Sequence, residues 1–158
     1  MKQNEKLSRR IFLTASAAPL GGAALAMAGG AEAATSTVAR LADVKPGKPV
    51  NFNYPGDEPA YLLDMGRAVA GGIGPKRAIV AYSALCQHMG CPVNYDDKSG
   101  QFVCPCHASR FDPARNGDAV EGPSTRGLPR IQLRLAGDAI QAVGIEQGVV
   151  YGRACNQG

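Results

Sequence analysis

Hydrophobic and polar residues alternate along the C-terminal part of the chain in a way that is typical of β-strands. Residues 131–135 read Ile-Gln-Leu-Arg-Leu, a period-two pattern that predicts a strand with one buried and one solvent-facing side. Gly137 and Asp138 separate this run from residues 139–143, and a glycine-led pair between two such runs predicts a two-residue hairpin turn. After residue 33, no stretch keeps the apolar spacing of an amphipathic helix over three turns.

Short apolar runs bounded by glycine and proline fill the rest of the chain after residue 33. The chain has 20 glycines and 11 prolines, more than average use, and most of them lie in this part. Five further runs are suited to strands: residues 50–54, 60–64, 78–82, 101–103 and 149–151. The pattern predicts a single small all-β domain, mostly antiparallel, with long functional loops between its strands.

The first 33 residues have the composition of an export signal rather than of a folded element. Arg9 and Arg10 precede a weakly apolar stretch at residues 11–28, which ends shortly before a small-residue Ala-Glu-Ala cleavage pattern. These features predict a twin-arginine signal that is removed, and therefore a periplasmic protein with its domain at residues 34–158. A retained membrane anchor is the alternative, but glycines and a proline make this stretch a poor membrane helix, so no stable membrane span is expected.

Composition and charge exclude one broad class of function. The formal net charge of +4 divides into +2 for residues 1–33 and +2 for the remainder, so neither part is basic enough to bind a polyanion. Aromatic residues make up only 6% and tryptophan is absent, which leaves little surface for stacking bases. We therefore expect no nucleic-acid partner.

Cysteine and histidine residues are concentrated in two short segments. Four of the five cysteines and both histidines lie in Cys86-Gln-His88-Met-Gly-Cys91 and Cys104-Pro-Cys106-His107. Zinc modules usually take two like ligands from each short segment, whereas here each segment offers a C-x-H or C-x2-H pair of one sulfur and one nitrogen. Such mixed pairs fit a binuclear iron–sulfur cluster with two cysteines on one iron and two histidines on the other. Two structural disulfides beside incidental histidines are the alternative.

The two segments resemble the C-x-H-x-G-C and C-x-C-H boxes of Rieske iron–sulfur proteins, in the same order and with both extra cysteines. The resemblance implies a Rieske-type antiparallel β-sandwich with an inserted cluster-binding subdomain at about residues 84–113. It also implies a Rieske [2Fe-2S] cluster. The implied ligands are Cys86 and Cys104 for the inner iron and His88 and His107 for the outer iron, with Cys91 and Cys106 joined as a disulfide.

Three further residues match positions that tune or shield the cluster in this family. Ser109 stands where high-potential members place a serine that donates a hydrogen bond to the cluster, but Phe111 stands where they place a tyrosine. Hydrogen bonds to cluster sulfur stabilise the reduced form, so the missing hydroxyl predicts a lower potential within the range of about −150 to +300 mV. Pro123, in a Gly-Pro-Ser segment, is similar to the family's covering loop and has no N–H to leave unpaired.

The wider sequence is similar to the small subunit of arsenite oxidase. The similar stretches are residues 49–55, 71–75, 79–83 and 150–153, and the resemblance spans residues 40–154. It implies a non-catalytic electron-transfer subunit, in a heterodimer or larger assembly with a molybdopterin iron–sulfur subunit that oxidises arsenite. The electron acceptor would be a periplasmic cytochrome c or small copper protein.

Other Rieske functions remain as alternatives or are excluded by the residue inventory. A Rieske subunit of a quinol–cytochrome c oxidoreductase and a free ferredoxin-like carrier both remain open. Ring-hydroxylating oxygenases need further histidines for a mononuclear iron, and the chain has only two histidines in all.

Overall fold

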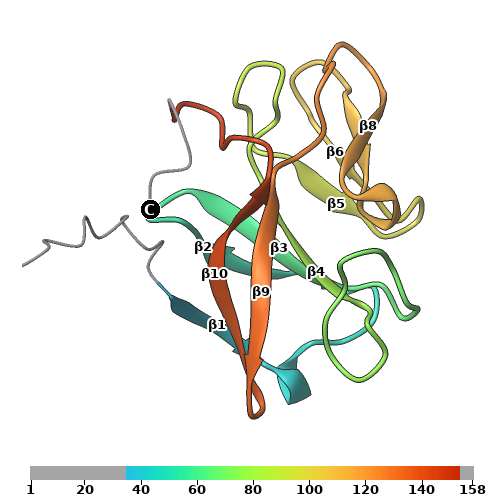
Figure 1. The fold of residues 1–158 in the computed structure, drawn as a ribbon. Coiled ribbons are helices and arrows are strands. Elements are labelled where there is room, and N and C mark those ends of the chain that lie inside the picture. Colours follow the sequence, from blue (N-terminus) through green and yellow to red (C-terminus); the bar gives the residue numbers. More distant parts are fainter. Residues whose placement is uncertain (1–34, 154–158) are drawn as a thin grey trace, which may run out of the picture.

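The computed structural model describes residues 35–153, which form two antiparallel β-sheets (Figure 1). The predicted export signal at residues 1–33 lies outside the described residues. The described part contains only two helices, both short 3₁₀ turns, at Leu41–Asp43 and Pro113–Arg115. None of the helices within residues 35–153 is long and apolar enough to cross a membrane. The prediction of an all-β fold is therefore confirmed.

The larger sheet has six strands in the order β1-β10-β9-β4-β3-β2. Their bounds are β1 Ser36–Arg40, β2 Val50–Asn53, β3 Pro59–Asp64, β4 Ile79–Ser83, β9 Arg130–Ala136 and β10 Ala139–Gln147. The predicted hairpin is confirmed, because Ala136 pairs with Ala139 across the Gly137-Asp138 turn. Gly137 adopts a φ of 64°, a left-handed conformation that glycine accepts without strain.

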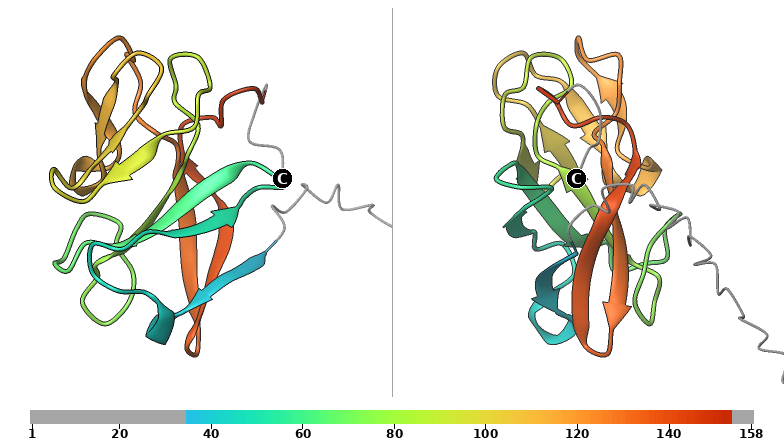
Figure 2. Two further views of the ribbon diagram at one scale, coloured as in Figure 1. Left: turned by 180° about the vertical axis from the view of Figure 1, so that it is seen from behind. Right: turned by 60° about the vertical axis from the view of Figure 1, so that its left-hand side comes forward.

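The smaller sheet has four strands in the order β5-β6-β7-β8 and lies beyond one end of the larger sheet (Figure 2). Their bounds are β5 Asn94–Asp96, β6 Gln101–Val103, β7 Arg110–Asp112 and β8 Asp118–Glu121. Since β8 pairs with β7, this sheet continues past residue 113, the approximate limit predicted for the subdomain. The predicted strand at residues 149–151 is wrong: the positive φ of Gly148 ends the extended run after β10, and none of these three residues belongs to a strand.

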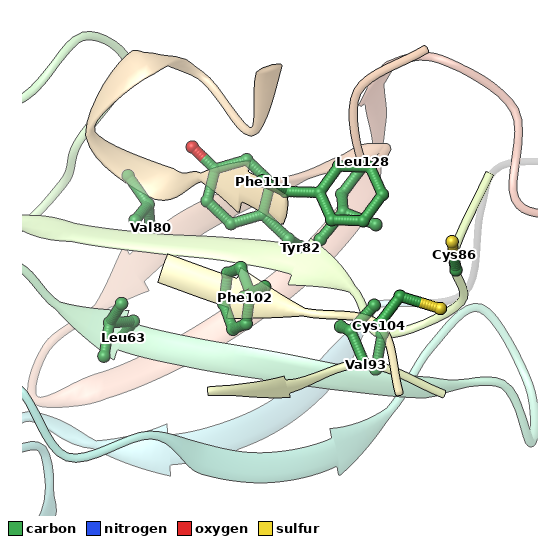
Figure 3. Close-up of a cluster of buried hydrophobic side chains, with 10 residues drawn as sticks. Leu63, Val80, Tyr82, Cys86, Val93, Phe102, Cys104, Phe111 and Leu128 are labelled. Atoms are coloured by element: carbon green, nitrogen blue, oxygen red, sulfur yellow. The ribbon is translucent and has the colours of Figure 1, made fainter. Parts of the chain in front are cut away.

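Strand β4 joins the two layers because it is buried along its whole length. Alternate residues of a strand point to opposite faces. Ile79 and Ala81 accordingly belong to the core of the larger sheet, whereas Val80 and Tyr82 belong to a second core that contains Phe102 of the smaller sheet (Figure 3). A strand with two buried faces reads as a continuous apolar run, as residues 78–82 do in the sequence.

Tyr82 connects the two layers through a buried hydrogen bond. Its hydroxyl donates to the carbonyl oxygen of Pro113 over 2.9 Å, and its ring meets the edge of Phe102. Burial raises the pKa of this hydroxyl far above its usual value, so it remains a donor at all physiological pH values.

We predict that Tyr82→Phe lowers the free energy of unfolding by about 1–3 kcal/mol, because it leaves the Pro113 carbonyl oxygen buried without its donor. Denaturant titration of the intact protein measures this change. Tyr95→Phe is the matched control, since the Tyr95 ring also contacts Phe102 but its hydroxyl has no hydrogen bond to any described residue. Equal stability of the two variants would contradict the assigned role of the Tyr82 hydroxyl.

Candidate metal centre

The two segments rich in cysteine and histidine form two loops that lie side by side at the same end of the molecule (Figures 1 and 2). The first loop follows β4 and contains Cys86 and His88. The second loop joins β6 to β7 and contains Cys104 and His107. Packing of the smaller sheet against β4 therefore brings together two loops that are separate in the sequence.

The same pair of backbone hydrogen bonds closes both loops. The N–H of Cys86 donates to the carbonyl oxygen of Cys91 over 2.9 Å, and the N–H of Gly90 donates back to Cys86 over 2.8 Å. In the second loop, the N–H of Cys104 donates to Ser109 over 2.8 Å, and that of Ala108 donates back to Cys104 over 3.0 Å. Each loop therefore holds its first cysteine at a fixed point of a closed turn.

A disulfide between Cys91 and Cys106 joins the two loops, with an S–S distance of 1.95 Å. Cys106 is exposed and Cys91 half-buried. The sulfur of Cys104 lies within 4.8 Å of both disulfide sulfurs, but these two are oxidised and cannot act as thiolate ligands. The disulfide therefore clamps the loops beside Cys104 and adds no metal ligand.

Cys86 and Cys104 are free and buried, and their side chains lie next to each other at one end of the core (Figure 3). Desolvation by burial raises the pKa of the Cys86 thiol. A buried thiolate needs a positive partner, which a bound metal provides. This pair is thus a candidate for two sulfur ligands on the inner side of the site.

The two histidines lie on the outer side of the same site. Their ring centroids are 4.9 Å apart and the rings are nearly perpendicular, with an interplanar angle of 85°. His107 is exposed and His88 half-buried. The Nδ1 atom of His88 is nevertheless buried, and no group within residues 35–153 makes a hydrogen bond to it. A buried polar atom without a partner is unusual, and metal ligation would satisfy it.

This donor set fits a binuclear iron–sulfur cluster. Two buried sulfurs and two outer imidazoles match a cluster in which one iron takes cysteine ligands and the other takes histidine ligands. The alternative of two structural disulfides does not hold, because Cys86 and Cys104 are both free.

The loop after β8 covers the second ligand loop. Gly122 has a φ of 84°, and a Cβ added to it would lie 2.5 Å from the Cα of Ser109. The N–H of Ser124 donates to the Ser109 hydroxyl over 3.1 Å, which leaves the hydroxyl hydrogen of Ser109 free to be donated elsewhere. Pro123 lies between these two contacts and is exposed.

Phe111 is fully buried in the core cluster that also contains Cys86 and Cys104. It pairs with Phe102 across β6 and β7. The structure thus places an apolar side chain, with no donor, at the position predicted to tune the cluster.

One contact at the site was not predicted from the sequence. The ring of Tyr151, near the end of the described chain, lies directly against Gly90 of the first ligand loop. The sequence predicts a strand at residues 149–151 and a family resemblance at residues 150–153, but no local pattern indicates the contact of Tyr151 with Gly90.

The fold and the paired cysteine–histidine loops define an iron–sulfur electron-transfer domain. Residues 34–132 match the family model described as the Rieske [2Fe-2S] domain, and the chain belongs to this family. Its cofactor is accordingly a Rieske [2Fe-2S] cluster.

Relatives with known names support the family and the fold. The chain is similar to the iodate reductase subunit IdrB of Denitromonas iodatirespirans, at 36% identity over 96% of this chain and 87% of that protein. It is 39% identical to IdrB of Pseudomonas sp. (strain SCT) over 77% of this chain and 65% of that protein. The soluble domain of Rieske protein II (soxF) from Sulfolobus acidocaldarius shares the fold, with a TM-score of 0.65, 23% identity, and coverage of 77% and 82% of the two chains.

We predict that the double variant Cys91→Ser/Cys106→Ser is less stable than the natural protein by about 3 kcal/mol. The disulfide closes a loop of 15 residues, and its removal restores conformational freedom to the unfolded chain. Denaturant titration under oxidising conditions measures the difference. A thiol reductant should destabilise the natural protein by the same amount and leave the variant unchanged; equal stability of the oxidised natural protein and the variant would contradict the clamp.

Proposed function

We propose that this protein is the electron-transfer subunit of a molybdenum-containing oxidoreductase, with Cys86 and Cys104 binding the inner iron and His88 and His107 the outer iron. The observation that carries the proposal is the asymmetry of the donor set. Both free cysteines are buried, whereas His107 is exposed beside the half-buried His88. When bound, the cluster supplies one-electron transfer, and this arrangement directs it through the histidine side.

The protein's own residues position this site and exclude water from its inner half. Val93, Phe111 and Leu128 pack in the same core as the two cysteines and leave that side without solvent. The closed hydrogen-bonded turns and the disulfide fix the spacing of the two loops. A site that changes little in shape between its two redox states needs such rigid support.

Two substrates are candidates for the large subunit, because each has separate support. The resemblance over residues 40–154 to the small subunit of arsenite oxidase supports arsenite oxidation, with electrons entering the cluster from the large subunit. The likeness to IdrB, which extends over 96% of this chain, supports iodate reduction, with electrons leaving the cluster toward the large subunit. In both cases a periplasmic cytochrome c or small copper protein would be the other partner.

The proposal places the protein in the periplasm, to which the twin-arginine pattern at residues 1–33 would direct it. This route carries folded proteins, which suits a subunit whose cluster is inserted before export. A role in a quinol–cytochrome c oxidoreductase has less support, since Phe111 lacks the hydroxyl that high-potential, quinol-oxidising members use.

We expect the complex isolated from periplasm to distinguish the two substrates by electron paramagnetic resonance. Anaerobic arsenite added to the oxidised complex should produce the signal of a reduced Rieske cluster if the large subunit oxidises arsenite. Iodate added to the dithionite-reduced complex should remove that signal if the large subunit reduces iodate. Arsenate and iodide, the respective products, are the matched controls. A complex that responds to neither substrate, but does respond to a quinol, would contradict the proposal.

We predict that Phe111→Tyr raises the midpoint potential of the cluster by roughly 40 mV, the equivalent of one hydrogen bond of about 1 kcal/mol to the reduced cluster. Redox titration monitored by electron paramagnetic resonance measures the potential. Phe52→Tyr adds the same hydroxyl to a residue that packs against the other core, which contains neither cysteine, and should leave the potential unchanged. An unchanged or lowered potential in Phe111→Tyr would contradict the tuning role.

A further inference from the structure

The chain continues past β10 and runs beside the first ligand loop (Figure 1). We call residues 148–153 the C-terminal strap. Val150 in the middle of the strap is completely buried, and the next residue, Tyr151, places its ring against Gly90. The strap therefore contacts the loop that contains His88, although the two segments lie far apart in the sequence.

An ion pair anchors the end of the strap to the turn between β2 and β3. The Nε and Nη2 atoms of Arg153 donate to the two carboxylate oxygens of Glu58 over 2.6 and 3.0 Å. Nη2 also donates to the carbonyl oxygen of Pro55 over 3.3 Å. A two-pronged pair of this kind fixes orientation as well as distance, and its charged groups are only partly exposed, at 29% and 23%.

Comparison of the two ligand loops shows what the strap does at Gly90. Gly90 and Ala108 occupy equivalent positions, since each donates back to the first cysteine of its loop. Both adopt a positive φ, 77° and 58° respectively. Ala108 shows that this turn accepts a Cβ, so the turn alone does not require glycine at position 90. The requirement comes from Tyr151, because a Cβ on Gly90 would lie 2.5 Å from the Cδ1 and Cε1 atoms of its ring.

We propose that Tyr151 is a positioning residue for the cluster: held by the Arg153–Glu58 pair, its ring supports the first ligand loop at Gly90 and thereby fixes His88 on the outer iron. Gly90 is two residues from His88 and adjacent to the disulfide cysteine Cys91, so a displacement at Gly90 moves the ligand. The second loop has its own cover, the Gly122 segment. The inference rests on the proposed assignment of His88 as a ligand.

The strap has a second effect, on solvent. Tyr151 is 39% exposed, and its ring covers the first ligand loop at Gly90, two residues from His88. Removal of the ring admits water to this side of the cluster. Water stabilises the more negative reduced cluster, so the midpoint potential should rise when the ring is lost. A residue that only stabilised the fold would leave the potential unchanged.

The test uses the cluster-loaded complex with three variants: Tyr151→Ala, Gly90→Ala and the double variant. We expect Tyr151→Ala to release iron to a chelator about tenfold faster than the natural protein and to show a raised midpoint potential. Gly90→Ala should accelerate iron release in the natural background. In the Tyr151→Ala background the ring no longer opposes the added methyl group, so the factor of acceleration should be about tenfold smaller. Additive effects of the two substitutions on iron release would overturn the proposal.

Matched variants separate positioning from general stability. Tyr151→Phe keeps the ring and should match the natural protein in both iron release and potential. Arg40→Gln breaks an exposed ion pair with Asp138 in the β9–β10 turn, at the end of the larger sheet away from the loops, and should also leave both unchanged (Figure 1). An unchanged potential in Tyr151→Ala, or the same shift in Arg40→Gln, would overturn the proposal.

Two further measurements keep the outcomes distinct. If Tyr151→Ala fails to retain a cluster, Glu58→Gln loosens the strap more gently, by removing one charge of its anchor, and should accelerate iron release to the chelator. An unchanged rate of iron release in Glu58→Gln would overturn the anchoring. A natural complex without a Rieske spectrum would contradict the proposed function itself, whereas a normal spectrum with additive variants contradicts only the role of the strap.

Discussion

The site depends on the burial of β4 between two cores. Because its alternate residues pack into opposite layers, a shift by one residue would move Tyr82 out of the core that contains Phe102 and break its hydrogen bond to Pro113. Cys86 follows three residues after the end of β4, and Cys104 comes directly after β6, which packs against the same core through Phe102. The register of one buried strand therefore determines where the two ligand loops meet, and the disulfide then fixes their separation.

The asymmetry between the buried cysteines and the outer histidines follows from the same packing. The cysteines lie where the loops leave the core, and the histidines lie two and three residues further along, toward the surface. In the proposed assignment, the sulfur ligands are thus kept away from water and the imidazole ligands lie toward the surface. The proposal therefore separates the buried part of the site from the part through which electrons would be exchanged.

Much of this was predictable from the sequence, and the rest was not for identifiable reasons. Period-two alternation and the Gly137-Asp138 turn predicted β9 and β10, and the chemistry of sulfur and imidazole indicated the cluster. Strands β5, β7 and β8 are only three or four residues long, too short to show a period, and exist because they pair with one another. The contact of Tyr151 with Gly90 could not be predicted, because the two residues lie far apart in the sequence and meet only in the folded protein. The apolar residues Val149 and Val150 predict a strand that the structure does not form.

The measurement that tests the central claim most directly is electron–nuclear double resonance on the reduced cluster of the intact protein, which detects the nitrogen atoms bound to iron. Two histidines on one iron predict two nitrogen couplings of similar strength, and replacement of His107 should remove one of them and leave the other. A cluster without strong nitrogen coupling would be one ligated by cysteine alone, and would contradict the assignment of His88 and His107 and the account built on it.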